Sequence, residues 1–205
     1  GLKKALNKSF AMKDMGPAKQ ILGMHIVWDR TKKLLWLSQE KYMTKVLQRF
    51  NRENAKPIGS TLRTNRKLSR RQSPKTKTEK AEMIKIPYAS VVESMMYAMV
   101  CTKPDIGYVV GVVNRFMNNP GNEHWATINW IFWYLKSTSS PCLQFGSGNP
   151  LLEGFTDSDI SADVDTNRST SGYVMTNAEG RCLVSIKIAE DCGVVAYRSG
   201  VHGSC

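Results

Sequence analysis

Paired cysteines and long apolar runs are absent from this chain of 205 residues. Its five cysteines are odd in number, and none of them stands in a Cys-x-x-Cys pair. The sequence therefore predicts neither a disulfide framework nor a zinc site, and it indicates a reducing compartment. No apolar run is long enough to cross a bilayer, and no signal peptide opens the chain. We expect an intracellular protein, cytoplasmic or nuclear, with no membrane partner.

Acidic residues are few. The chain has 17 Asp and Glu against 29 Lys and Arg, a net charge of +12, and no two Asp residues stand side by side. Residues 52–85 alone hold eleven basic residues and three Glu, which is +8 of that charge. Such a concentration is typical of a segment that meets phosphates, in nucleic acid or on a membrane surface. A disordered, solvated loop whose charge only keeps it soluble fits the composition equally well.

The sequence does not indicate a serine or cysteine nucleophile activated by a histidine. None of the three histidines stands at a spacing from Ser or Cys that suggests such a pair. We therefore expect structural roles for them, including His124 at the start of a helix. For Tyr88, Tyr97 and Tyr108 we likewise expect core positions rather than platforms for base stacking.

The strongest pattern is a central stretch, residues 87–136, in which apolar residues recur at helical spacing in three runs. The second run is expected to begin at Thr102, whose hydroxyl can accept a free N–H of the first turn. It ends at Asn119-Pro120-Gly121, because proline lacks the N–H of a helix and glycine adopts the turn cheaply. The third run is apolar almost all round, so it predicts a helix buried between its neighbours. The runs are Val92, Met96, Met99 and Val100; Ile106, Val109, Val110, Val113 and Phe116; and Trp125, Ile128, Ile131, Phe132 and Leu135.

The stretch before this block predicts a hairpin and a helix. Residues 21–28 alternate between two faces, and residues 34–37 form a second strand after a polar turn. Ser38 is expected to cap a helix over residues 39–51, which has apolar residues on one face and basic residues on the other. Residues 52–86 then predict a basic linker that is too polar to pack.

After Pro141 the composition changes, and short runs predict further strands. They are residues 142–145, 151–156, 172–175 and 183–188. A chain of this length can bury one good core or two small ones, and the change in composition favours two. The sequence as a whole predicts an α+β protein in four parts, residues 1–51, 52–86, 87–140 and 141–205.

Several motifs stand in a fixed order along almost the whole chain. They include Leu22-Gly23-Met24, Leu37-Ser38-Gln39-Glu40-Lys41-Tyr42, Thr102-Lys103-Pro104-Asp105-Ile106, Asn119-Pro120 with His124-Trp125, and Arg168-Ser169-Thr170-Ser171-Gly172-Tyr173. In order and spacing they resemble the Pol polyprotein of copia-type retrotransposons. The resemblance implies the C-terminal part of a reverse transcriptase, with the end of the palm, a primer-grip-like hairpin and a thumb helix over 1–51. A helical thumb and connection over 87–140 and an incomplete ribonuclease H-like sheet over 141–205 would follow.

The resemblance also implies partners. The hairpin would touch the end of a primer. Lys41, Lys45 and Arg49, on the polar face of the helix over 39–51, would lie against the backbone of a duplex such as an RNA–DNA hybrid. The remainder of Pol, its palm and fingers, would complete the protein. From the residues alone, an open alternative is that Lys41, Lys45 and Arg49 face water and contact no ligand.

For catalysis the resemblance implies Mg²⁺ ions held by carboxylates. The family's Tyr-x-Asp-Asp motif lies upstream of this region, and no Asp-Asp pair occurs here, so we expect no polymerase activity from this chain alone. Asp157, in the run Gly154-Phe155-Thr156-Asp157-Ser158-Asp159, matches the first metal ligand of ribonuclease H. The match departs from the family at Ile160 and Ala162, where tryptophan and glycine are usual. Further acidic residues nearby are Asp159, Asp163 and Asp165.

The tail, residues 197–205, departs further from the family. A family helix at this place reads Thr-Glu-Ala-Glu-Tyr-Met-Ala-Ala and carries a catalytic Glu, and the tail can be back-translated so that the next reading frame spells that sequence. We therefore expect a frameshift before Tyr197 and the loss of that Glu, for which Glu190 and Asp191 are not expected to substitute. The expected function is a fragment of an RNA-directed DNA polymerase and ribonuclease H that is inactive alone and binds no Mg²⁺ itself. The alternative is a non-catalytic basic module that binds nucleic acid.

Overall fold

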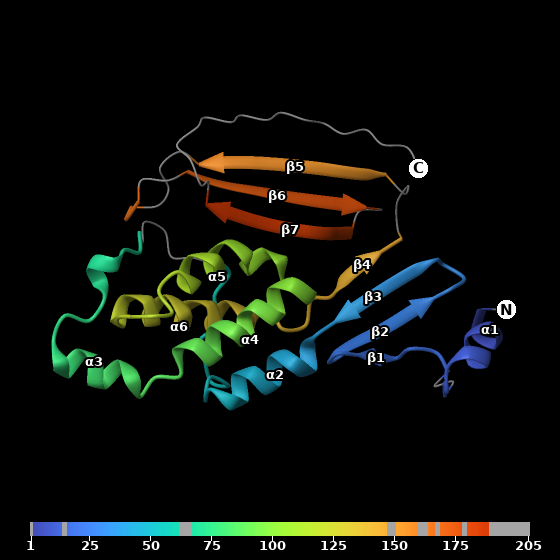
Figure 1. Ribbon diagram of the computed structural model, residues 1–205, viewed down its shortest axis with the longest axis horizontal. Helices are drawn as coiled ribbons and strands as arrows, with labels where there is room; N and C mark the ends of the chain where they lie inside the picture. The colour runs from blue at the N-terminus through green and yellow to red at the C-terminus, as the bar shows by residue number, and fades with distance from the viewer. Residues whose placement is uncertain are drawn as a thin grey trace.

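The computed structural model describes residues 2–13, 16–61, 67–146, 151–159, 164–166, 169–177 and 180–188. Two antiparallel sheets accompany a layer of helices: a four-stranded sheet lies beside the helices, and a three-stranded sheet lies above them in the view of Figure 1. The predicted α+β class is confirmed. The expectations about Ile160, Ala162, Asp163, Glu190, Asp191 and the tail lie outside the described residues. Within the described ranges, no helix has the length and apolar character needed to cross a membrane.

The four-stranded sheet is built around the predicted hairpin. Its two central strands pair antiparallel, with Ile26 opposite Leu37 and Trp28 opposite Leu35. The last strand comes from far along the chain, with Phe145 opposite Leu35, which confirms the short strand predicted at 142–145. The strand order is β1-β2-β3-β4, and a short helix, α1 (Leu2–Ser9), precedes the sheet. The strands are β1 (Gln20–Ile21), β2 (Met24–Asp29), β3 (Leu34–Ser38) and β4 (Leu143–Phe145).

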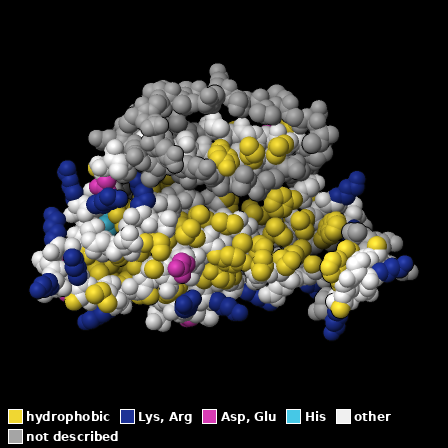
Figure 2. Space-filling view, viewed as in Figure 1, with side chains coloured by type: hydrophobic (Ala, Val, Ile, Leu, Met, Phe, Trp, Pro, Cys, Tyr) yellow, Lys and Arg dark blue, Asp and Glu magenta, His cyan; other side chains and the backbone are white. Residues whose placement is uncertain are grey.

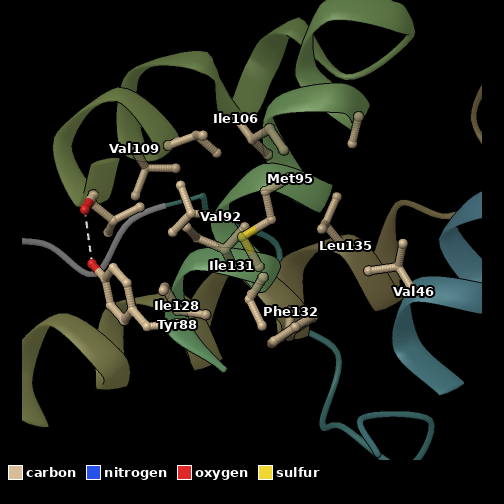
Figure 3. Close-up of a cluster of buried hydrophobic side chains, with 14 of the residues drawn as sticks. Val46, Tyr88, Val92, Met95, Ile106, Val109, Ile128, Ile131, Phe132 and Leu135 are labelled. Atoms are coloured by element: carbon tan, nitrogen blue, oxygen red, sulfur yellow. Dashed lines mark hydrogen bonds between the residues drawn. The ribbon is translucent and has the colours of Figure 1, made fainter. Parts of the chain in front are cut away.

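The helices share one hydrophobic core, to which the three predicted central runs contribute most of the side chains (Figure 3). Burying each large apolar side chain stabilises the fold by about 1.5–3 kcal/mol relative to leaving it exposed. The hydroxyl of Tyr88 enters this core and donates a hydrogen bond to the carbonyl oxygen of Val113 at 2.8 Å. The elements are α2 (Glu40–Arg49), η1 (Arg70–Gln72), α3 (Lys77–Ile84), α4 (Tyr88–Cys101), η2 (Pro104–Ile106), α5 (Gly107–Asn114) and α6 (Asn122–Ser137).

The prediction that Thr102 caps the N-terminus of the second central helix is wrong. The residue is buried at the C-terminal end of α4, and its hydroxyl donates a hydrogen bond to Oε1 of Gln39 at 2.7 Å. The next helix begins instead with the 3₁₀ turn η2 and continues as α5. Ser38 lies one residue before the N-cap position of α2, but its hydroxyl accepts the N–H of Glu40 at 3.3 Å.

The prediction that residues 52–86 are too polar to pack is also wrong. This stretch contains η1 and α3, and it buries Leu68 and Met83. Both short helices begin with a capping box, in which Ser69 and Thr76 accept backbone N–H groups of the first turn. The caps supply local stability that composition alone does not reveal, because they depend on residue order.

The second sheet follows the helices. Its three strands lie antiparallel in the order β5-β6-β7, with an irregularity between Met175 and Thr176. The strands predicted at 151–156, 172–175 and 183–188 are confirmed: the first begins one residue later and ends three residues later than predicted, and the other two begin earlier. The strand nearest the helical layer is β7, which lies against α5 (Figure 1). The strands are β5 (Leu152–Asp159), β6 (Thr170–Asn177) and β7 (Gly180–Ile188).

Candidate nucleic-acid interface

The three basic residues predicted to meet a duplex lie on one exposed face of α2. Lys41, Lys45 and Arg49 are all exposed and stand four residues apart, so successive side chains rise along the helix by about 6 Å. The guanidinium carbon of Arg49 also lies 5.3 Å from the centre of the Phe50 ring. We call these three residues the α2 basic face. It presents a row of cations to solvent, as contact with a phosphate backbone requires.

The opposite face of α2 is fixed to the core. Met43, Val46 and Leu47 are buried there. The hydroxyl of Tyr42 donates to the carbonyl oxygen of Ser94 on α4 at 3.1 Å. Burial raises the pKa of that hydroxyl above its ordinary value of 10.0. The basic face is therefore held on a rigid support.

An exposed aromatic residue at the hairpin was missed by the sequence analysis. Trp28 on β2 is 62% exposed, and the guanidinium carbon of Arg30 lies 4.8 Å from the centre of its ring. Leu22, at the turn between β1 and β2, is exposed as well. A flat ring beside a cation is suited to stacking on a base. The signal in the sequence was a tryptophan at the end of a strand, next to a turn carrying an arginine.

The predicted metal ligand Asp157 lies in β5, where its backbone pairs with Gly172 of β6. Asp159, two positions further along the same strand, pairs with Thr170. Among the described residues, no group of three or more His, Cys, Asp or Glu side chains is placed to hold a metal ion. The role of Asp157 as a metal ligand stays a prediction.

Asp165, an acidic neighbour of that strand, is already engaged. Its Oδ1 accepts a hydrogen bond from the hydroxyl of Ser69 at 2.6 Å, and its Oδ2 accepts one from the backbone N–H of Arg70 at 2.8 Å. The carboxylate thus caps the start of η1 and ties the loop after β5 to the helical layer. Nothing in the sequence pointed to this contact, because the partners are 96 and 95 residues apart.

Ser69, His124 and Asp165 come together, but they do not form a catalytic triad. His124 is fully buried, and its Nδ1 accepts the N–H of Gly121 at 2.8 Å while its Nε2 faces the carbonyl oxygen of Ser69 at 3.2 Å. The serine hydroxyl donates to the carboxylate rather than to the ring. A triad needs the imidazole to accept the proton of the nucleophile. The geometry gives His124 the structural role that we expected.

The tyrosines differ from expectation at two positions. Tyr88 is in the core as predicted. Tyr97 is half-buried and lies outside the core cluster, so the prediction of a core position for it is wrong. Tyr108 is 44% exposed, so the prediction of a core position for it is wrong. It lies on the outer side of α5, because neighbouring Val109 and Val110 take the inward positions.

A buried lysine was also missed. Lys103 is only 4% exposed, and its Nζ donates to the carbonyl oxygens of Thr138 and Pro141, the latter at 3.2 Å. Burial lowers its pKa, and the nearby charge of Asp105 opposes that shift. The ammonium group closes the C-terminal end of α6 and fixes the path into β4, so this lysine holds the sheet to the helices.

Comparison with known proteins identifies the kind of chain. The Pol polyprotein of transposon TNT 1-94 from Nicotiana tabacum, described as retrovirus-related, is 54% identical over 179 residues, 87% of this chain and 14% of that protein. The corresponding Pol polyprotein of transposon RE1 from Arabidopsis thaliana is 32% identical over 83% of this chain and 11% of its own length. Secreted RxLR effector protein 161 of Plasmopara viticola is 39% identical over 102 residues, 49% of this chain and 71% of that protein. No family model and no solved structure matches the chain.

The matches define a class of protein, the polyproteins of retrotransposons. The chain belongs to the retrotransposon Pol polyproteins, and the family resemblance read from its motifs is confirmed. It spans about one seventh of the tobacco polyprotein, so it corresponds to one part of such a protein.

Proposed function

We propose that this chain is the part of a copia-type Pol that holds a nucleic-acid duplex between the polymerase and ribonuclease H regions. In this proposal the hairpin and α2 act as the end of the palm and the thumb, α4 to α6 form the connection, and the β5-β6-β7 sheet begins the ribonuclease H domain. The rest of the palm and the fingers come from another part of Pol. The ligand is an RNA–DNA hybrid or another duplex, bound inside the cell.

The observation that carries this proposal is the α2 basic face. Its three cations stand on one side of a helix whose other side is locked into the core. Contacts from such a face to phosphates position a duplex without reading its sequence. Each neutralised phosphate releases counterions, so binding weakens as salt rises.

We propose that the complete Pol, and not this chain alone, carries out catalysis. The chain has no Asp-Asp pair for the polymerase reaction. Of the acidic residues around the first ribonuclease H strand, Asp165 is engaged by Ser69 and Arg70. Two metal ions would normally activate the attacking oxygen and stabilise the leaving one. We expect Mg²⁺ to be held by the parent enzyme with carboxylates from elsewhere.

A second candidate is a non-catalytic binding module that works without the polymerase. One observation favours it: α2, α4, α5 and α6 close a hydrophobic core from residues of this chain. The two candidates share the α2 basic face. They differ in whether the bound duplex is held for the active sites of a complete Pol or held without any catalysis.

The test is the salt dependence of binding by the 205-residue chain to a labelled RNA–DNA hybrid, measured by fluorescence anisotropy. The variant K41Q/K45Q/R49Q removes three charges from α2. The variant K13Q/K56Q/K136Q removes three charges from exposed positions elsewhere and serves as the control. For the α2 variant we expect the slope of log K against log salt to become shallower by about 2 to 3, since each contact contributes about 0.9. Equal slopes for the two variants would overturn the proposal.

A further inference from the structure

Residues 52–86, the strongly basic stretch that the sequence predicted to be a linker, are folded in their second half. Between residues 67 and 85 the seven basic side chains are all exposed and belong to, or flank, η1 and α3. They are Lys67, Arg70, Arg71, Lys75, Lys77, Lys80 and Lys85. Only two acidic residues, Glu79 and Glu82, stand in the same stretch. We call these seven residues the η1–α3 basic surface.

The two acidic residues offset only part of the positive charge of this surface. The carboxylate of Glu79 accepts the backbone N–H groups of Lys75 and Thr76, at 2.8 and 3.2 Å. These bonds lower the pKa of Glu79 and commit it to capping α3. The seven basic and two acidic residues leave this stretch with a net charge of +5.

The surface is held in place by contacts at its base. Met83 is buried beneath α3. Ser69 is bound by both His124 and Asp165, from elements far along the chain. Gly121 fits so closely against η1 that a Cβ on it would lie 2.0 Å from the carbonyl oxygen of Gln72. A preorganised row of cations loses less entropy on binding than a free loop does.

We infer that the η1–α3 basic surface is a second contact for the same nucleic-acid backbone, additional to the α2 basic face. Figure 2 shows Lys and Arg side chains along the left and lower edges of the molecule, over α3 and α2, with hydrophobic side chains across the middle. A phosphate backbone following that edge meets both groups of cations. This inference rests on the proposed function, because it takes the duplex as the ligand.

An anionic membrane is the competing ligand for a basic helix. A membrane-surface helix also needs a broad apolar face beneath its charges. On α3 the only large apolar side chain that is exposed is Ile84, at 83%, within the described part of the chain. One isoleucine does not make such a face, so the surface favours the sugar–phosphate backbone of nucleic acid.

The experiment extends the salt titration with the full chain and the same labelled hybrid. The variant K77Q/K80Q/K85Q removes two charges from α3 and one from its C-cap residue, and R70Q/R71Q probes η1 independently of α3. We expect the α3 variant to make the slope shallower by about 2 to 3 and the η1 variant by about 2. The scattered variant K13Q/K56Q/K136Q is expected to leave the slope near that of the unmodified chain. Vesicles containing phosphatidylserine are tested alongside.

The outcomes separate the inference from the proposed function. If the α2 variant changes the slope while the α3 and η1 variants match the scattered control, the second surface is overturned and the proposed function stands. If only the α3 and η1 variants change it, the second surface stands and the proposed role of α2 is overturned. If the α2, α3 and η1 variants all have the same slope as the scattered control, the inference and the proposed function are both overturned. Binding to vesicles that the α3 variant loses, with hybrid binding unchanged, assigns the surface to membrane and overturns the inference.

Discussion

His124 donates a hydrogen bond from Nε2 to the carbonyl oxygen of Ser69 at 3.2 Å, from within a fully buried ring. The donor assignment follows from the other nitrogen, since Nδ1 already accepts the N–H of Gly121. The ring also stacks on Phe116, with centroids 4.0 Å apart. The start of α6, the turn η1 and the end of α5 are thus joined through one neutral imidazole.

The first prediction concerns pH. Burial lowers the pKa of His124 below its ordinary value of 6.5, although Ser69, Asp165 and Glu123 oppose the shift. The unfolded chain therefore binds a proton at a higher pH than the folded chain does. The stability that the neutral His124 contributes is fully present above pH 6.5. It is lost as pH drops below that value, by up to about 1.4 kcal/mol per pH unit. Urea unfolding at pH 7.5 and 5.5 measures this loss. The variant H124Q should show a smaller loss, and an equal loss in both proteins would contradict the assignment.

The second prediction concerns the close approach at Gly121. In G121A the new Cβ meets the carbonyl oxygen of Gln72, which is backbone and cannot swing away. We expect a destabilisation of about 1–3 kcal/mol, as for other overpacked sites. The matched control is G111A in α5, where nothing lies within 4 Å of the added atom. Thermal denaturation should show a lower midpoint for G121A and an unchanged or higher one for G111A.

The third prediction concerns Lys103. The variant K103M keeps the length of the side chain but leaves the carbonyl oxygens of Thr138 and Pro141 without their donor. Losing a partner for a buried polar group costs about 1–3 kcal/mol. The variant K136M, at an exposed position of α6, removes the same charge without that loss. A stability of K103M equal to that of K136M would show that the ammonium group does not close α6.

The fourth prediction concerns Asp165. Removing its carboxylate in D165A frees the backbone N–H of Arg70, to which both carboxylate oxygens are bound. Hydrogen exchange at the Arg70 amide should accelerate several-fold. The amides of Thr31 and Lys32, capped by Asp29 in the hairpin, provide an internal control and should not change. Unchanged exchange at Arg70 would mean that the loop after β5 does not hold η1.

Local patterns were enough to predict most of the helices and strands. The central helices follow from apolar residues such as Val92, Val109 and Ile131 at helical spacing, and all three are buried. The hairpin follows from alternation on both sides of a polar turn. These features depend on neighbours in the sequence, which a single sequence displays.

The errors involve partners that are far apart in the chain. Thr102 has the pattern of a helix N-cap, but it lies at the C-terminal end of α4 and its hydroxyl binds Gln39, 63 residues earlier. Leu68 and Met83 are apolar residues in a mostly polar stretch, and only the folded chain shows that they are buried. For the candidate site, sequence alone placed the α2 cations on one face but gave no sign of the contacts that fix η1 and α3. The role of Asp157 stays a prediction.

The most direct test of the central claim is lysine footprinting of the full chain, free and bound to an RNA–DNA hybrid. Acetylation of each lysine is followed by mass spectrometry at low salt. We predict that Lys41 and Lys45 become several-fold less reactive in the complex, while Lys13, Lys56 and Lys136 keep their rates. Equal reactivity of Lys41 and Lys45 in the free and bound chain would contradict the account.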